Sequence, residues 1–118
     1  MNTQSVLAKK RIYICSPLRG DIENNIVRAK QFCRWVFELG GIPIAPHVAY
    51  AGILNDDIHE ERQLALQAGL ELVKICDELW HFEREISSGM NAEITLARGL
   101  SIPVRNIVSI PDYKKDMK

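Results

Sequence analysis

The sequence lacks an excess of charge of either sign, because 15 lysines and arginines balance 15 aspartates and glutamates over 118 residues. Without a net field there is no general attraction to nucleic acid or an anionic membrane, so we expect neither a nucleic-acid polymer nor a membrane as partner. It also lacks an apolar run long enough to cross a bilayer, and its first ten residues contain no continuous apolar segment typical of secretory signals. These absences predict a cytoplasmic protein.

Cysteine is scarce, odd in number and without the short spacings of a zinc site. Cys15, Cys33 and Cys76 each lie in an apolar run, which predicts buried, reduced thiols. The three histidines show no metal-like pairing either. We therefore predict no metal and no cofactor.

Short apolar runs rich in β-forming residues alternate with stretches of helical spacing. The runs predict strands at 11–15, 42–45, 77–82 and 102–105, with 107–110 as an extension or a fifth strand. Helices are predicted from the N-cap Asp21 to Gly40, from 59 to 76, and from 89 to 99 with Ser88 as N-cap, while 48–58 is predicted to be a loop. In the second of these helices the apolar side is expected to carry Leu64, Ala68, Leu72 and Ile75.

This alternation over short connections predicts an α/β fold, a three-layer doubly wound parallel sheet of four to five strands with helices on both faces. The length fits one domain, which we place at 11–110 between an N-terminal extension, 1–10, and a C-terminal tail, 111–118. In such sheets a ligand binds beyond the carboxyl ends of the strands. The segments that follow the first three strands should therefore hold the functional residues.

A turn that enters the last predicted helix, Ser87 to Glu93, contains one candidate site. The first amides of a helix are unpaired and its dipole favours an anion, so a phosphate can dock beside Ser87, Ser88 and Gly89. Glu93 shares one side of this helix with Met90 and is expected to face inward, where a carboxylate can attack a sugar's anomeric carbon. The pattern alone leaves open an ordinary N-cap followed by a solvent-facing glutamate.

The end of the first strand contains the second candidate site, with the hydroxyl of Ser16, the guanidinium of Arg19 and the turn residue Gly20. Arg19 is suited to phosphate because its planar group binds two oxygens at once. The alternative is a surface turn residue paired with Asp21 or Glu23, the more common case for an isolated arginine. Tyr13 is expected to bury its ring while its hydroxyl reaches the site. His47, after the second strand, can be catalytic or structural.

Together these residues resemble the nucleoside 2-deoxyribosyltransferase superfamily, including its branch of 2′-deoxynucleoside 5′-monophosphate N-glycosidases, and short bacterial and phage proteins of unassigned function. The resemblance covers about residues 11 to 106 and depends on the order and spacing of four motifs. These are Tyr13-Ile-Cys-Ser-Pro-Leu-Arg-Gly, Pro46-His47-Val48-Ala49, Cys76-Asp77, and Ser87-x-Gly89-x-x-x-Glu93-Ile-x-x-Ala97.

The resemblance implies a flavodoxin-like sheet and cleavage of an N-glycosidic bond, by hydrolysis or transfer, with Glu93 attacking C1′. It implies that Arg19, Ser87 and Gly89 hold a 5′-phosphate and that Tyr13 belongs to the same pocket. Free-nucleoside transferases often carry an aspartate where this chain has Ser87, so a nucleotide is the favoured small-molecule partner. The resemblance also implies a homo-oligomer.

One position departs from the family pattern. The family usually places an aspartate about two turns before Cys76-Asp77, and the corresponding position in this chain is near Gly69. The helix offers Glu60, Glu61 and Glu71 instead, and none of them clearly replaces it by register. An enzyme that lacks this acid can lose rate or change substrate. Two alternatives therefore stay open: a non-catalytic module that binds or sequesters a nucleotide in the same pocket, and a structural subunit without a small-molecule site.

Overall fold

A computed structural model describes residues 4–82 and 86–113 of the chain. Its centre is a four-stranded sheet in the order β2-β1-β3-β4, in which every neighbouring pair is parallel. The strands are β1 (Arg11–Cys15), β2 (Ile42–Ile44), β3 (Glu78–Phe82) and β4 (Val104–Ile107). The all-parallel sheet confirms the predicted fold class.

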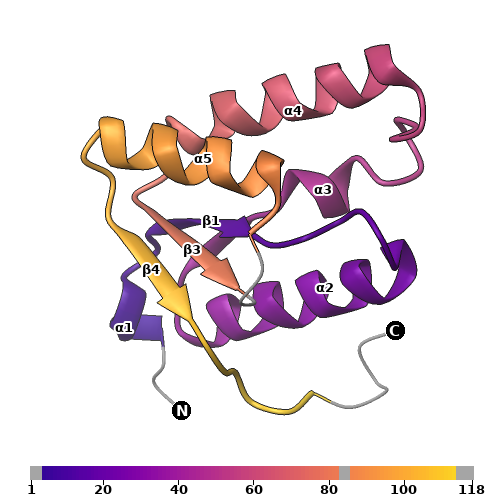
Figure 1. Cartoon of the computed structure of the whole chain (residues 1–118). Coiled ribbons are helices and arrows are strands. Elements are labelled where there is room, and N and C mark those ends of the chain that lie inside the picture. The colour runs from indigo at the N-terminus through magenta and orange to yellow at the C-terminus, as the bar shows by residue number, and fades with distance from the viewer. Residues whose placement is uncertain (1–3, 83–85, 114–118) are drawn as a thin grey trace.

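The helices cover the sheet on both sides. They are α1 (Gln4–Leu7), α2 (Ile22–Glu38), α3 (Pro46–Ala49), α4 (His59–Val73) and α5 (Ser88–Gly99). In Figure 1, α4 and α5 lie over one face of the sheet and α2 lies under the other, which gives the three layers of a flavodoxin-like fold.

The alternation of side chains along β1 assigns its residues to two separate cores. Ile12 and Ile14 point to one face, where they join Phe32 and Val36 of α2. Tyr13 and Cys15 point to the other, where they join α4 and α5 residues such as Val73, Met90 and Ile94. Because successive side chains of a strand face opposite sides, Tyr13 necessarily lies on the face that α4 and α5 cover.

Several predicted boundaries are wrong by a few residues. β4 begins at Val104 rather than at 102 and continues to Ile107, and among the described residues no fifth strand follows it. The predicted loop 48–58 begins inside the short helix α3, whose first position is Pro46, where the missing amide has no helical partner to lose.

Helix α4 differs from prediction in its end and in its buried face. It ends at Val73, and Leu64, placed on the core side, is 60% exposed. Its buried residues are instead Gly69 and Val73, one turn apart. The side of α4 that carries Gly69 therefore faces the core, and a Cβ atom there would lie 2.9 Å from the hydroxyl of Tyr13.

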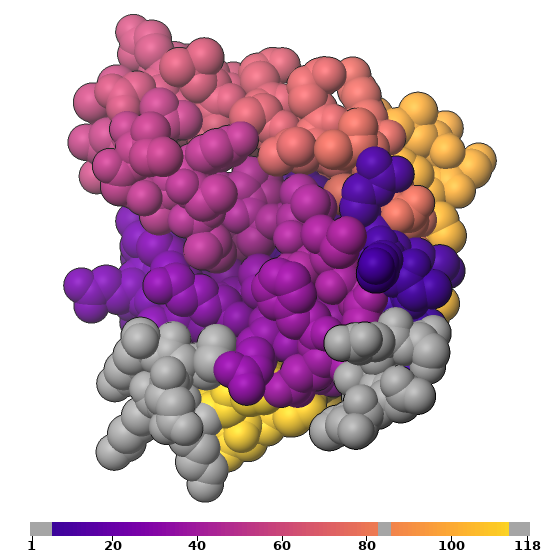
Figure 2. Space-filling view, turned by 180° about the vertical axis from the view of Figure 1, so that it is seen from behind, coloured from indigo at the N-terminus to yellow at the C-terminus, as the bar shows by residue number. Residues whose placement is uncertain are grey.

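The described ends of the chain both contact the α2 side. Leu7 of α1 is 8% exposed and belongs to the core cluster that contains Phe32. Gln31 of α2 donates from Nε2 to the carbonyl of Tyr113 at 2.9 Å, and Tyr113 donates its hydroxyl to Glu38. Figure 2 shows the C-terminal segment, in yellow, beside the violet α2 region.

Candidate active site

A pocket of ≈ 170 Å³ lies where the carboxyl end of β1, α3, α4 and the start of α5 meet. It is lined by all but one of the residues that the sequence singled out: Tyr13, Ser16, Arg19, His47, Ser87, Ser88, Gly89, Met90 and Glu93. Gly20 does not line it. With φ +95, Gly20 adopts a turn conformation that side chains rarely allow, and its role is to turn the chain after β1.

A tyrosine and a glutamate meet inside the pocket. The ring of Tyr13 is 1% exposed, and its hydroxyl donates to Oε2 of Glu93 at 2.6 Å. Burial raises the pKa of Glu93, although hydrogen bonds from Tyr13 and Cys15 act in the opposite direction. Burial and the adjacent Glu93 also raise the pKa of Tyr13. Tyr13 therefore stays a hydrogen-bond donor, and the carboxylate is held with one oxygen fixed.

Gly69 of α4 closes the pocket behind this pair. A Cβ atom at position 69 would lie 2.9 Å from the Tyr13 hydroxyl and 3.1 Å from Oε2 of Glu93. In this arrangement there is no space for any side chain at 69. Gly69, near which the resemblance expects an acid, thus lies beside the candidate nucleophile and contributes only backbone.

A second polar pair lies at the ends of β1 and β2. Oγ of Ser16 and Nε2 of His47 are 2.8 Å apart, and both residues line the pocket. Burial lowers the pKa of His47 to about 4. His47 is therefore neutral near pH 7 and can exchange a hydrogen bond with Ser16 without adding charge to the pocket.

The start of α5 supplies backbone amides to the pocket. Its N-cap is Ser87, whose Oγ accepts from the amide of Met90 at 3.2 Å, so the prediction of Ser88 as N-cap is wrong by one residue. Ser88 is instead the first helical residue, where the leading amides have no partner within the helix. These amides and the close approach allowed by Gly89 suit an anionic group.

Arg19 is paired within the pocket wall. Its Nε lies 3.2 Å from Oδ2 of Asp56, whose side chain is 20% exposed. The pairing matches the interpretation of Arg19 as an ion-paired residue, but the partner is 37 positions away along the chain rather than local. Arg19 lines the pocket with its charge already opposed by a carboxylate.

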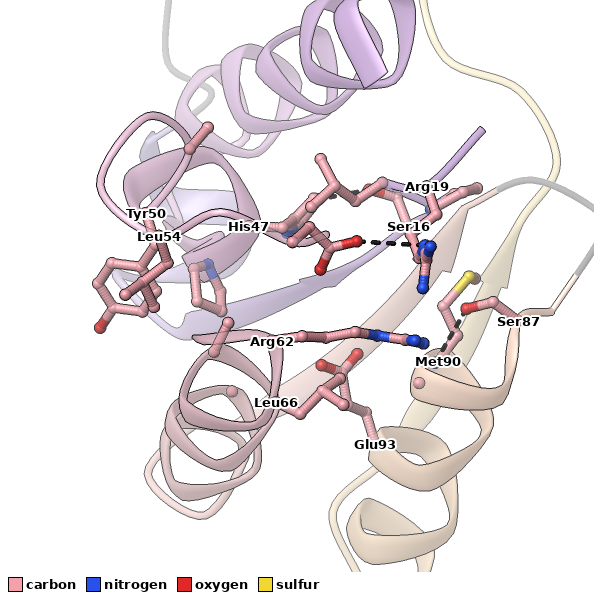
Figure 3. A pocket seen from close by; sticks show the side chains of 18 of the residues that line it. Ser16, Arg19, His47, Tyr50, Leu54, Arg62, Leu66, Ser87, Met90 and Glu93 are labelled. Carbon is pink, nitrogen blue, oxygen red and sulfur yellow. Dashed lines mark hydrogen bonds and ion pairs between the residues drawn. The ribbon is translucent and has the colours of Figure 1, made fainter. Parts of the chain in front are cut away.

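Sequence reasoning missed the contribution of α4. This helix lines the pocket with Arg62, Ala65, Leu66 and Gly69, and Figure 3 shows Arg62 extending across the pocket above Glu93. Their spacing of three or four residues is that of one helical face. This spacing is visible in the sequence, but the larger apolar residues on the other side of α4 favoured that side as the buried face.

Two further findings concern only residues 4–82 and 86–113. No group of three or more His, Cys, Asp and Glu side chains gathers there in a way that would hold a metal ion. No helix in the same part of the chain is long and apolar enough to cross a membrane.

Comparison with known proteins gives a family and a fold. The model of a family described as "Domain of unknown function (DUF7768)" matches residues 10–107. No curated protein matches the chain. A solved structure of a 2-deoxyribosyltransferase from the psychrotolerant bacterium Bacillus psychrosaccharolyticus is similar, with a TM-score of 0.62 and 20% identity over 81% of this chain and 70% of that one. That enzyme is described as a biocatalyst for the synthesis of nucleosides.

Proposed function

Because the chain belongs to the DUF7768 family, whose description gives no activity, we propose a function from the pocket itself. The proposed function is cleavage of the N-glycosidic bond of a (deoxy)nucleoside 5′-monophosphate, with Glu93 as nucleophile. The hydrogen bond between Tyr13 and Glu93 carries this proposal. The fold shared with a 2-deoxyribosyltransferase supports it, as does the resemblance of the motifs that line the pocket.

The chemistry follows from how the carboxylate is held. Tyr13 binds Oε2 of Glu93, which leaves the other oxygen to attack C1′ of the sugar. As the C1′–O bond forms, the C1′–N bond breaks and its electron pair leaves with the base, which takes a proton from solvent. Water, or a second base, then attacks C1′ and releases Glu93. Neither half of the reaction needs a cofactor.

The opposite side of the pocket suits the 5′-phosphate. Ser87, Ser88 and Gly89 present hydroxyls and the unpaired amides of the first turn of α5, which favour a negatively charged group. A carboxylate at position 87 would repel phosphate, whereas a serine there can donate to it. A nucleotide is therefore the proposed substrate in preference to a free nucleoside.

A second candidate function has an observation of its own. Gly69 contributes no side chain beside Glu93, so the pocket lacks an acid at the place where the family pattern has one. A protein with this pocket can bind a nucleotide without cleaving it. This binding module would be recognised by stoichiometric binding of a nucleotide that is recovered unchanged after denaturation.

The test is release of free base from a panel of ribo- and deoxyribonucleoside 5′-monophosphates, followed by mass spectrometry. Glu93→Gln keeps the size of the side chain but removes the nucleophile, and we expect it to lower the rate roughly a thousandfold or more. Glu60→Gln is the matched control, because Glu60 is exposed on α4 and does not line the pocket.

The outcomes separate the two candidates. Release of base by the wild type and by Glu60→Gln, with loss in Glu93→Gln, supports the enzyme. If the wild type and Glu93→Gln are equally inert on every nucleotide while both bind one, the binding module replaces it. If Glu93→Gln remains fully active, Glu93 is not the nucleophile.

A further inference from the structure

Arg62 lines the pocket, although no motif in the sequence identifies it as a site residue. It lies in the second turn of α4 and is partly buried. Figure 3 shows its side chain crossing the pocket from α4, with its guanidinium on the side where Ser16, Arg19 and Met90 lie. In this view the group passes above Glu93, and both side chains line the same pocket.

The two arginines of the pocket differ in how their charges are balanced. Arg19 is paired with Asp56, whose Oδ2 is 3.2 Å from the guanidinium Nε. Among the ion pairs of residues 4–82 and 86–113, none includes Arg62. Its neighbour Glu61 also lines the pocket, and its Oε1 accepts from the amide of Asn55 at 2.8 Å.

We propose that Arg62, rather than Arg19, is the residue that recognises the phosphate of the substrate and so selects nucleotides over nucleosides. This proposal builds on the proposed function and names a specificity residue for it. A guanidinium without a carboxylate partner offers two parallel N–H donors to two phosphate oxygens, and it loses no existing ion pair when it does so. Arg19 must share its charge with Asp56.

The start of α5 completes the anion site. Ser87 and Ser88 line the same pocket as Arg62, so an anion there is in reach of a guanidinium from α4 and of helix amides from α5. Each of these features alone is common on protein surfaces. They converge on one pocket that also contains the half-buried carboxylate of Glu93. This arrangement suits a ligand with a phosphate at one end and a neutral sugar beside Glu93.

Asp56 then has a definite role in the pocket. Its Oδ2 is buried and has no well-aligned hydrogen bond, so its main interaction is the charge of Arg19. Asp56 thereby fixes the Arg19 side chain as part of the wall and reduces its attraction for the ligand. Asp56→Asn should release that charge and strengthen the binding of anions.

Binding measurements test the proposal without relying on turnover. Calorimetry would compare the four deoxyribonucleoside 5′-monophosphates with the four matching nucleosides, on wild type, Arg62→Gln, Arg19→Gln and Asp56→Asn. Arg62→Gln is expected to weaken nucleotide binding about 10- to 100-fold, the value of a lost charge-assisted contact, while nucleoside binding changes less than about twofold. Arg98→Gln, an exposed arginine of α5 that does not line the pocket, is the matched control.

Each result has a defined meaning. A nucleotide-specific loss in Arg62→Gln that exceeds the loss in Arg19→Gln supports the proposal, as does a gain in Asp56→Asn. Equal weakening of nucleotides and nucleosides, no change, or a larger loss in Arg19→Gln overturns it. So does a wild type that binds no nucleotide. If nucleotides bind through Arg62 but no base is released, the proposed cleavage fails and this assignment stands.

Discussion

Two glutamates near opposite ends of the sheet, Glu78 of β3 and Glu93 of α5, are surrounded very differently. Glu78 begins β3 and is 4% exposed. It accepts hydrogen bonds from Lys10 at 3.2 Å, Trp80 at 2.8 Å and Arg105 at 2.8 Å. Glu93 of α5, half-buried at the pocket end, accepts a hydrogen bond of 2.6 Å from the hydroxyl of Tyr13. Within residues 4–82 and 86–113 it takes part in no ion pair.

The difference in partners gives the two carboxyl groups opposite pKa directions. Burial acts to raise the pKa of Glu78, but the hydrogen bonds from Trp80, Arg105 and Lys10 together bring it below the ordinary value. Burial also acts on Glu93, where the weaker compensation by Tyr13 and Cys15 leaves the pKa raised. A carboxyl group with several donors stabilises the fold, whereas a carboxyl group in a pocket whose pKa is raised is a candidate for a functional role.

The largest expected effect follows from breaking the well-paired site. Glu78→Gln keeps the shape of the side chain but removes the charge that three donors share. Charge-assisted hydrogen bonds contribute about 1.5–3 kcal/mol each, and Lys10 and Arg105 recover part of this because they are half exposed. We expect a loss of about 2 kcal/mol in the free energy of unfolding at pH 7, measured by urea denaturation.

The pH dependence of this loss identifies its cause. Because the folded-state pKa of Glu78 is lowered, its contribution is present above the unfolded pKa and disappears as the pH falls through the folded pKa. The gap between wild type and Glu78→Gln should therefore close in acid. A gap that stays constant from pH 7 down to pH 3 would assign the loss to packing instead.

The next effect tests how tightly α4 approaches the poorly paired glutamate. Gly69→Ala places a methyl group 2.9 Å from the Tyr13 hydroxyl and 3.1 Å from Glu93, so the pair must move. Overpacking usually destabilises by about 1–3 kcal/mol, and alanine returns about 1 kcal/mol in helix propensity, which leaves a net loss of about 1 kcal/mol. Thermal denaturation would measure it, and any base release should fall with it.

Gly99→Ala is the matched control, because nothing lies within 4 Å of the Cβ it would add at the end of α5. This variant should be neutral or slightly more stable than the wild type. If Gly69→Ala proves as stable as Gly99→Ala and retains full activity, the close contact between α4 and the Tyr13–Glu93 pair is not a constraint.

The same contrast explains what could be predicted from sequence. Ser16, His47 and Ser87 follow three different strands, and parallel strands bring their carboxyl ends to one edge, so their convergence was predictable. The hydrogen bond between Tyr13 and Glu93 required only that strand alternation and helix register face each other. Regular spacing therefore predicts the part of the site that β1 and α5 contribute.

The contributions of α4 and of the loop before it could not be predicted in the same way. The large apolar side chain of Leu64 predicted that its side of α4 would be buried, but Leu64 is exposed. The buried side is the one that carries Gly69, because Gly69 allows α4 to lie against Tyr13 and Glu93, and this tertiary contact cannot be read from the spacing of residues. The ion pair between Arg19 and Asp56 joins two loops far apart in the chain, and no periodicity links them. Arg62 was missed because the apolar pattern of α4 drew attention to the side that carries Leu64.

The smallest expected effect is a gain in stability when the charge of the poorly paired glutamate is removed. Since the folded-state pKa of Glu93 is raised, its favourable contribution is full below the unfolded pKa and is lost as the pH rises through the folded pKa. Glu93→Gln should therefore have a free energy of unfolding higher than that of the wild type at pH 8, by up to about 1 kcal/mol. The difference should be smaller at pH 4, and denaturation at the two pH values would measure it. Glu78→Gln provides the opposite sign under the same conditions. If both substitutions shift stability in the same direction at pH 8, the two ends of the sheet do not differ in the way that their hydrogen bonds indicate, and the pocket glutamate is as fully compensated as the structural one.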